Sequence, residues 1–316
     1  MKIVEEAAER IKSLEVQGAT NVALTAVRAL VEQMELFEAK DRDSALAEIA
    51  IARDILFQTR ETEPFMRNAV RYIERELREG EWRSVGELRG VAQRLADELF
   101  EEFQRSRRRT AEVGAKRIRP GYRVLTHCHS SAVTMVFREA KRQGVDFEVI
   151  LTETRPRYQG RITARELLDM GVRATMIVDS AVRSFIKGSD LVLVGADAIT
   201  SEGNVINKIG SSQVALAADE ARIPFYVVTE LLKFDPQTVH GDYEAIEERD
   251  ASEVWEDAPE GLCIRNPAFD VTRRDYIHGI ICEEGIISPQ SIMEAIRRRH
   301  PWLLETAGTS SHGPSP

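Results

Sequence analysis

From Tyr122 onward, short runs of β-branched and other large apolar residues alternate with stretches of helical periodicity. The apolar runs occupy residues 124–126, 147–151, 176–178, 191–194 and 225–228. The helical stretches between them occupy residues 132–143, 163–170, 181–187 and 214–221. Nearly continuous apolar strands separated by helices are typical of a parallel sheet covered on both faces. We therefore predict a Rossmann-like, doubly wound α/β domain over residues 120–303.

Residues 1–119 follow a different pattern, which is typical of an α-helical domain. They contain one of the 11 prolines, Pro64, and five of the 19 glycines. Apolar residues recur at helical spacing, for example between positions 22 and 30. We predict an N-terminal helical domain over residues 1–119, with a break between helices at Pro64. The polar segment 304–316 is predicted to be a flexible tail.

Composition restricts the class of protein further. A chain of 316 residues that is 43% hydrophobic can bury two sizeable cores. Three cysteines are too few for a disulfide framework, which favours a reducing compartment. Residues 1–15 lack the apolar core of a signal peptide, and no run approaches the roughly 18 apolar residues of a membrane span. We predict a cytoplasmic protein without a membrane partner, and a net charge of −9 argues against direct nucleic-acid binding.

Every predicted strand is followed by polar residues. They occupy positions 126–130, 152–155, 179–180, 195–197 and 229–230. In an open parallel α/β sheet, ligands bind beyond the carboxyl ends of the strands, so these residues should meet at one edge. A thiol, several carboxylates and an arginine would gather there. The alternative is that these positions are ordinary surface loops.

Among single residues, Cys128 is the strongest candidate for a catalytic residue. It follows the first predicted strand and precedes a predicted helix start at Ser130. Because a helix N-terminus lowers the pKa of a nearby thiol, we predict a thiolate that acts as a base or nucleophile. Cys263 and Cys282 are interpreted as packing residues. A zinc site at 127–129 is disfavoured because neighbouring strand side chains point to opposite faces and no second ligand pair follows.

Two other charged features have alternative interpretations. Asp197 follows a run of apolar residues, where partial desolvation would raise its pKa enough for it to act as an acid at neutral pH. Its alternative role is to cap the following turn. The basic run at 107–109 lies among glutamates and is interpreted as a solvated helix face.

Two loops have the composition of anion-binding sites. In the segment 203–212, Gly210 permits a close backbone approach, the following serines can start a helix whose N–H groups face an anion, and Lys208 supplies a charge. The segment 155–160 contains two arginines, a glutamine and a glycine and is the second candidate. A solvated basic turn is the alternative for that second loop.

Five motifs together resemble one superfamily, which contains the alpha, beta and delta regulatory subunits of translation initiation factor 2B and two sugar-phosphate isomerases. The motifs are THCHS at 126–130, ETRPRYQG at 153–160, VGAD at 194–197, NKIG at 207–210 and NPAFDVT at 266–272. The resemblance extends from residue 18 to about residue 289. It is strongest to the ribose-1,5-bisphosphate isomerase branch.

The resemblance implies conversion of ribose 1,5-bisphosphate to ribulose 1,5-bisphosphate in nucleotide metabolism, without a metal or redox cofactor. It also implies a homo-oligomer built on a dimer. Cys128 is implied as the catalytic base and Asp197 as the proton donor. With Arg155 from the second anion loop, the expected substrate-binding residues are Gln17, Gly18, Ala19, Arg60, Ser130, Arg155, Gln159, Asn207, Lys208 and Lys233.

Two alternatives remain. One is a non-catalytic regulatory subunit that binds a sugar phosphate or nucleotide and partners with initiation factor 2. It is favoured by less positive charge at three positions of the isomerase pattern, where this chain has Gln17, Glu61 and Ser131. Methylthioribose-1-phosphate isomerase is disfavoured because that enzyme's Asn and Gly do not follow Cys128. The joint presence of Cys128 and Asp197 favours an enzyme over a regulatory subunit.

Overall fold

The computed structural model describes residues 1–60, 62–242 and 246–305, which form two compact units. The first unit contains Met1–Gln104 and Glu305, and the second contains Arg105–Leu304. Among the described residues, no helix carries an apolar stretch long enough to cross a bilayer. Glu61 and positions 306–316 of the predicted tail lie outside the described residues.

The first unit is helical, as its periodicity predicts. Pro64 is the first residue of a helix, where its missing N–H breaks no hydrogen bond. The apolar positions of the second helix are buried, and the rings of Phe65 and Phe103 stack with centroids 4.3 Å apart. The elements are α1 (Lys2–Lys12), α2 (Ala19–Gln33), the one-turn η1 (Met34–Leu36), α3 (Arg42–Phe57), α4 (Pro64–Glu79) and the first part of α5 (Val85–Ala115). Helix α5 continues into the second unit, and α11 (Trp302–Glu305) ends the described chain.

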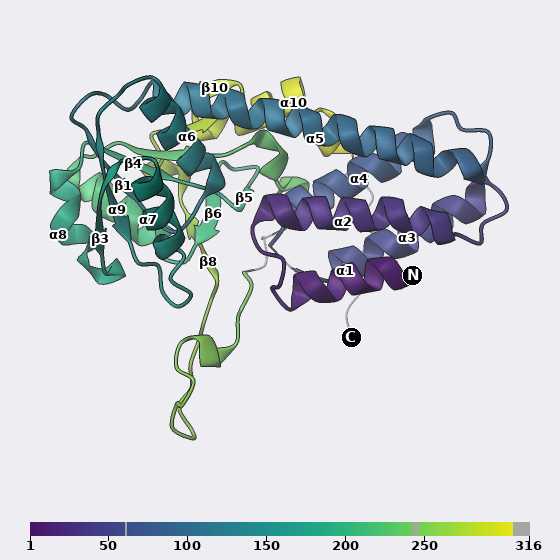
Figure 1. The fold of residues 1–316 in the computed structure, drawn as a ribbon, viewed down its shortest axis with the longest axis horizontal. Helices are drawn as coiled ribbons and strands as arrows, with labels where there is room; N and C mark the ends of the chain where they lie inside the picture. The colour runs from purple at the N-terminus through teal and green to yellow at the C-terminus, as the bar shows by residue number, and fades with distance from the viewer. Residues whose placement is uncertain (61, 243–245, 306–316) are drawn as a thin grey trace. The chain divides into compact units, whose positions relative to one another are not determined.

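The second unit is built on a seven-stranded sheet with the order β10-β9-β7-β4-β1-β2-β3. Strands β1, β3, β4 and β10 of this sheet are labelled in Figure 1. Adjacent strands are parallel except β10, which is antiparallel to β9. The strands are β1 (Arg123–Thr126), β2 (Glu148–Thr152), β3 (Arg173–Ile177), β4 (Leu191–Val194), β7 (Phe225–Val228), β9 (Gly279–Cys282) and β10 (Gly285–Ile287). The predicted fold class is therefore confirmed, and the five predicted strands are present.

Among the described residues, four α-helices lie between strands of the second unit, and α10 (Ile292–Arg299) follows the last strand, β10. The four are α6 (Ser131–Arg142), α7 (Gly160–Asp169), α8 (Val182–Phe185) and α9 (Ser211–Ala221). Single turns occur at η2 (Asp179–Ala181), η3 (Ile186–Gly188), η4 (Leu231–Lys233), η5 (Pro236–His240), η6 (Ala251–Glu253), η7 (Arg274–Tyr276) and η8 (Pro289–Ser291). Helix α6 packs against α7, and α8 packs against α9. Since the chain leaves β1 in one direction and returns to β4 on its other side, right-handed crossovers place the two pairs on opposite faces of the sheet.

A small antiparallel sheet was not anticipated from the sequence. It consists of β5 (Ala198–Ile199), β6 (Val205–Lys208) and β8 (Phe269–Thr272), in the order β5-β6-β8. Asn207 and Lys208 therefore lie on a paired strand instead of in a loop. Asn207 is opposite Asp270 in the register of β6 with β8. A late segment of the chain thus holds two of the predicted binding residues.

The topology of the large sheet explains where a ligand can bind. The chain proceeds from β1 to β2 on one side and later returns to β4 on the other side of β1. In open α/β sheets, the crevice outside the carboxyl ends at such a reversal is the usual binding place. Cys128 follows β1 and Asp197 follows β4, so both lie at this crevice.

Candidate active site

Cys128 adopts a left-handed backbone conformation immediately beyond β1, with φ of 67°. This region costs a residue with a Cβ atom roughly 1–2 kcal/mol. Two threonine hydroxyls hold it there. The N–H of Cys128 donates to Thr154 Oγ1 at 3.0 Å, and its carbonyl accepts from Thr163 Oγ1 at 3.0 Å. We call Thr154, which follows β2, and Thr163, in α7, the threonine clamp.

The threonine clamp is itself held from both sides. The N–H of Thr154 donates to Asp179 Oδ1 at 2.8 Å. Thr163 Oγ1 lies 3.1 Å from His129 Nδ1, and His129 Nε2 lies 3.7 Å from a carboxylate oxygen of Glu166. Burial lowers the pKa of His129, which favours a neutral ring. A connected set of polar groups from β2, β3 and α7 therefore fixes the backbone that carries the thiol.

His127 lies buried beside this arrangement and uses both ring nitrogens. Nδ1 lies 2.7 Å from Thr152 Oγ1, and Nε2 lies 2.8 Å from the carbonyl oxygen of Ile209. Gly210 packs on the ring so closely that a Cβ atom there would lie 2.9 Å from Nε2. Within residues 1–60, 62–242 and 246–305, no group of three or more His, Cys, Asp or Glu side chains is arranged to hold a metal ion.

Cys128, Asp197 and Lys208 interact electrostatically. Burial raises the pKa of the Cys128 thiol to about 12, the N–H of His129 lowers it, the charge of Asp197 raises it and the charge of Lys208 lowers it. The prediction of a thiol with a lowered pKa is therefore wrong. Helix α6 begins only at Ser131, and desolvation of the sulfur outweighs the single N–H that faces it. At neutral pH the thiol is protonated.

Two predicted binding residues, Ser130 and Asn207, meet at Gly195. Ser130 is the N-cap of α6, and its hydroxyl accepts from the N–H of Val133 at 3.4 Å. A Cβ atom at Gly195 would overlap the Ser130 side chain, and it would lie 4.0 Å from Asn207 Oδ1. Asn207 donates to Ser211 Oγ at 2.7 Å. The absence of a side chain at Gly195 thus allows Ser130 and Asn207 to approach the same point.

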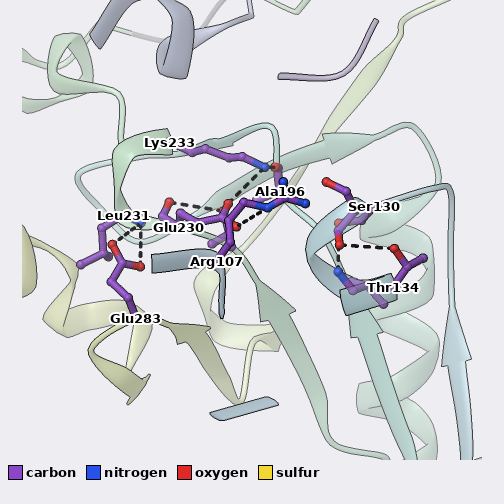
Figure 2. Close-up of polar contacts among 11 residues, drawn as sticks. Arg107, Ser130, Thr134, Ala196, Glu230, Leu231, Lys233 and Glu283 are labelled. Carbon is purple, nitrogen blue, oxygen red and sulfur yellow. Dashed lines mark hydrogen bonds and ion pairs between the residues drawn. The ribbon is translucent and has the colours of Figure 1, made fainter. Parts of the chain in front are cut away.

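Lys233 supports the peptide next to Asp197 (Figure 2). Its Nζ donates to the carbonyl of Ala196 at 2.8 Å and lies 3.8 Å from Glu230 Oε2. Arg107 Nε lies 3.8 Å from the other oxygen of Glu230. Arg107 is mostly buried, so the interpretation of its basic run as a solvated face is wrong for this residue. Lys233 and Arg107 thus face the buried carboxylate of Glu230, and Lys233 links it to the peptide before Asp197.

Asp270 binds the N-terminus of α9, where the sequence predicts a phosphate. Helix α9 begins at Ser211 after Gly210, which has φ of 104°. Asp270 Oδ2 accepts from the N–H of Gly210 at 2.8 Å and from the hydroxyl of Ser212 at 2.8 Å. The N–H of Ser212 lies 3.1 and 3.2 Å from the two carboxylate oxygens. The chain therefore supplies the anion at this helix, and the predicted phosphate loop is wrong in that respect.

The second predicted anion loop has mainly structural contacts. Arg155 donates from its guanidinium to the Tyr158 hydroxyl at 2.7 Å and to the Val254 carbonyl at 2.8 Å. Its N–H donates to Asp179 Oδ2 at 2.7 Å. Gln159 directly precedes α7, and its buried Oε1 accepts no hydrogen bond from any described residue. Gln159 thus has a free acceptor, whereas Arg155 ties this loop to the segment around η6.

Four predicted binding residues belong to the first unit. Gly18 is the N-cap of α2 with φ of 83°, and Ala19 is the first residue of that helix. Gln17 directly precedes them, and its side-chain amide donates to the Leu14 carbonyl at 2.9 Å. Arg60 is buried and forms an ion pair with Glu63 at 2.8 Å. Their contact with a substrate stays a prediction.

A cavity of about 290 Å³ lies beside His127, between η2, α8 and α9. Neither Cys128 nor Asp197 lines it. Its charged groups already have partners, since Arg183 pairs with Glu220 and Asp179 accepts two N–H groups. It therefore adjoins residues that hold the thiol, but neither Cys128 nor Asp197 reaches it.

Sequence reasoning also missed Arg249, which lies between η5 and β8. Its charge lowers the pKa of Lys208, so it lies within electrostatic reach of that residue. No motif marks this position. Only the structure marks Arg249, because its side chain is buried and its Nε has no acceptor among the described residues.

Comparison with known proteins gives consistent results. Residues 15–289 match the initiation factor 2 subunit family. Ribose 1,5-bisphosphate isomerase of Archaeoglobus fulgidus is 46% identical over 304 residues, covering 95% of this chain and 94% of that protein. Methylthioribose-1-phosphate isomerase of Pelotomaculum thermopropionicum is 37% identical, covering 90% and 82%. The crystal structure of translation initiation factor eIF-2B from Pyrococcus horikoshii has a TM-score of 0.78 and 33% identity, covering 90% and 97%.

Proposed function

The chain belongs to the initiation factor 2 subunit family, and within it we propose that this protein is a ribose 1,5-bisphosphate isomerase that forms ribulose 1,5-bisphosphate. Several relatives that align over nearly the whole chain carry this enzyme's name. The observation that carries the proposal is the electrostatic grouping of Cys128, Asp197 and Lys208 at the reversal point of the sheet. This group supplies a proton donor, a proton acceptor and a cation for a sugar phosphate.

The chemistry explains why an acid and a base are needed together. The substrate carries a phosphate on C1, so no free aldehyde is present and the bond between C1 and the ring oxygen must break first. An acid protonates the leaving ring oxygen, and a base removes the proton from C2, which gives an enol that still carries the C1 phosphate. Return of a proton to C1 and loss of the C2 hydroxyl proton complete the 2-ketone. The two groups exchange protons with the substrate and end where they began.

We assign the acid to Asp197 and the base to Cys128. The charge of Asp197 raises the pKa of the thiol, so a proton on Asp197 removes one obstacle to forming the thiolate. Transfer of the thiol proton of Cys128 to the carboxylate of Asp197 gives the thiolate base and the carboxylic acid together, with no change in the total charge of the site. Lys208 lowers the thiol pKa in the same site. This coupling allows a buried thiol with a high resting pKa to serve as a base during turnover.

Neighbouring residues have supporting roles in this proposal. The threonine clamp fixes Cys128, and Lys233 fixes the peptide before Asp197 through the Ala196 carbonyl. Gln159 offers a buried acceptor for a sugar hydroxyl. Exclusion of water by the buried surroundings protects the enol from side reactions.

A regulatory subunit is the second candidate. The observation that favours it is the protonated thiol, because a sugar-phosphate sensor needs no thiolate. Such a protein would keep the binding residues and partner with initiation factor 2. The homo-oligomer built on a dimer stays a prediction under either function, and light scattering of the purified protein measures it.

The decisive experiment follows formation of ribulose 1,5-bisphosphate from ribose 1,5-bisphosphate. Wild type should turn over, and Cys128→Ser and Asp197→Asn should each lose about 100- to 10,000-fold in kcat. Cys263→Ser is the matched control. Cys263 is exposed, so its interpretation as a packing residue is wrong, and its substitution should not affect the rate. Absence of turnover by wild type, or wild-type rates in both site variants, contradicts the enzyme. Co-purification with an initiation factor 2 subunit supports the regulator.

A further inference from the structure

Lys208 is a buried lysine whose charged group has no partner among the described residues. Its side chain lies on β6, and only 5% of the residue is exposed. Its ammonium group makes no hydrogen bond or ion pair with the part of the chain that the structure describes. Buried charges in proteins are normally paired, because an isolated charge in a low-dielectric interior is costly. A bound anion would satisfy this requirement.

Arg249 is a second buried cation with too few partners. Its side chain is 8% exposed, and one guanidinium nitrogen, Nη2, donates to Glu253 Oε1 at 2.8 Å. Its Nε is buried and has no acceptor within the described residues. A guanidinium offers five N–H donors. Most of the donor capacity of Arg249 is therefore available to another group.

The nearby carboxylate cannot neutralise both cations. Glu253 also pairs with Arg157, whose Nη1 lies 2.9 Å from the same Oε1 atom. Two arginines thus share one negative charge, while Lys208 adds a third positive charge and Asp197, within electrostatic reach of Lys208, adds a second negative one. Lys208 is opposite Phe269 in the register of β6 with β8, and the N–H of Arg249 donates to the carbonyl of Asn266, three residues earlier in the chain. The two cations therefore lie on neighbouring backbone, and the charge of Arg249 lowers the pKa of Lys208. Three cations therefore face two carboxylates, and Lys208 and Arg249 are the two that are buried.

The segment that carries Arg249 is held rigidly against the site. The carbonyl of Val254 accepts from Arg155, and the side-chain amide of Asn266 donates to the Asp250 carbonyl at 2.9 Å. The N–H of Arg249 donates to the Asn266 carbonyl at 2.9 Å. Arg155 and Arg157 therefore act as supports for this segment. Arg249 is placed by these contacts before any ligand arrives.

We propose that Arg249 and Lys208 form a phosphate-binding subsite for one phosphate group of the sugar phosphate. The inference rests on the proposed function for the identity of the ligand. A guanidinium matches a phosphate with two parallel hydrogen bonds, and an ammonium adds a point charge. Because Lys208 also interacts with Cys128 and Asp197, the bound phosphate lies beside the reacting carbons. Gln17 and Ser131 carry no positive charge where the isomerase pattern has it, and the subsite supplies positive charge from other residues.

The test measures which ligands lose affinity when Arg249 is changed. Titration calorimetry is performed on the full chain with ribulose 1,5-bisphosphate, ribulose 5-phosphate and ribulose 1-phosphate. Arg249→Met should weaken the bisphosphate and one of the two monophosphates by roughly 10- to 100-fold. The other monophosphate, which lacks the phosphate at this subsite, should change by less than about threefold. Arg249→Lys keeps a charge and should weaken the same two ligands by a smaller factor.

Arg265→Met is the matched control. Arg265 lies in the same segment and pairs with both oxygens of Glu248 at 3.0 Å, but its side chain is 76% exposed. It should leave all three affinities unchanged. Equal loss for all three ligands in Arg249→Met, or no loss for any, overturns the subsite. If Arg249→Met does not fold, the same ligand selectivity in Arg249→Lys decides the question.

This result is separable from the test of the enzyme. Failure of wild type to form ribulose 1,5-bisphosphate overturns the isomerase, whereas the subsite is judged by binding alone. A selective loss of one monophosphate in a protein without turnover would keep the subsite and assign it to a sensor.

Discussion

Thr163→Val should reduce kcat by roughly 10- to 100-fold while changing KM by less than about threefold. The substitution keeps the volume of the buried side chain and removes its hydroxyl. That hydroxyl donates to the Cys128 carbonyl at 3.0 Å and lies 3.1 Å from His129 Nδ1. Because α7 keeps its packing, the effect should act on the position of the thiol.

The magnitude follows from two contributions. A carbonyl left without its hydrogen bond in a buried place costs roughly 1–3 kcal/mol. The left-handed conformation of Cys128, with φ of 67°, stores about another 1–2 kcal/mol that the threonine clamp offsets. About 1.4 kcal/mol is a factor of ten in a population. Loss of Thr163 therefore shifts the backbone of Cys128 toward other conformations by at least about tenfold.

The assay is steady-state turnover of ribose 1,5-bisphosphate by purified variants of the full chain. Thr163→Ser keeps the hydroxyl and should recover most of the wild-type kcat. Thr134→Val is the matched control, since Thr134 is also buried in a helix but donates only within α6, to the Ser131 carbonyl at 3.3 Å. A Thr163→Val enzyme with wild-type kcat refutes the reasoning. So does a Thr163→Ser variant as slow as Thr163→Val.

Three more predictions concern the thiol and the start of α9. Alkylation of Cys128 by iodoacetamide, followed by peptide mass spectrometry, should accelerate with pH through pH 10 without a plateau, because the thiol pKa is about 12. A plateau near pH 9 would contradict this. At fixed pH, Asp197→Asn should speed this alkylation, because it removes a charge that raises the thiol pKa. Lys208→Met should slow it, because it removes a charge that lowers the thiol pKa. Identical alkylation rates in wild type and both variants would exclude the coupling. Asp270→Asn should lower the free energy of unfolding in urea by about 1–3 kcal/mol, whereas the exposed Asp275→Asn should cost less than about 0.5 kcal/mol.

The fold class was accessible from the sequence because the central strands are buried on both faces. Runs such as Leu191–Val194 have no polar alternation, and such runs separated by helices indicate a parallel sheet. The strands β9 and β10 were missed because Gly279 and Gly285 interrupt the apolar pattern at their starts. The small sheet was missed because β6 ends in Asn207 and Lys208. Pairing with β8 stabilises these polar residues in a strand, and local sequence does not reveal that partner.

The candidate site could be predicted only in part from the sequence, because several of its features depend on contacts between residues that are far apart in the chain. The ends of β1 and β4 could be matched through the sheet rule, which brought Cys128 and Asp197 to one crevice. The pKa of the thiol was predicted in the wrong direction because burial of the sulfur depends on tertiary packing. Occupation of the α9 start by Asp270 depends on a contact between residues 60 positions apart, so local motifs favoured a phosphate there. Arg249 was missed because what marks it as a binding residue is a buried N–H group without an acceptor among the described residues, which only the structure shows.

The contact between Asp270 and α9 has a consequence for the order in which the chain becomes structured. During synthesis, Gly210 leaves the ribosome 60 residues ahead of the carboxylate that binds its N–H. Over that interval the N–H groups of Gly210 and Ser212 lack the carboxylate that accepts from them, and β6 lacks β8. The start of α9 and the pairing of β6 therefore depend on residues 269–272, which are synthesised later.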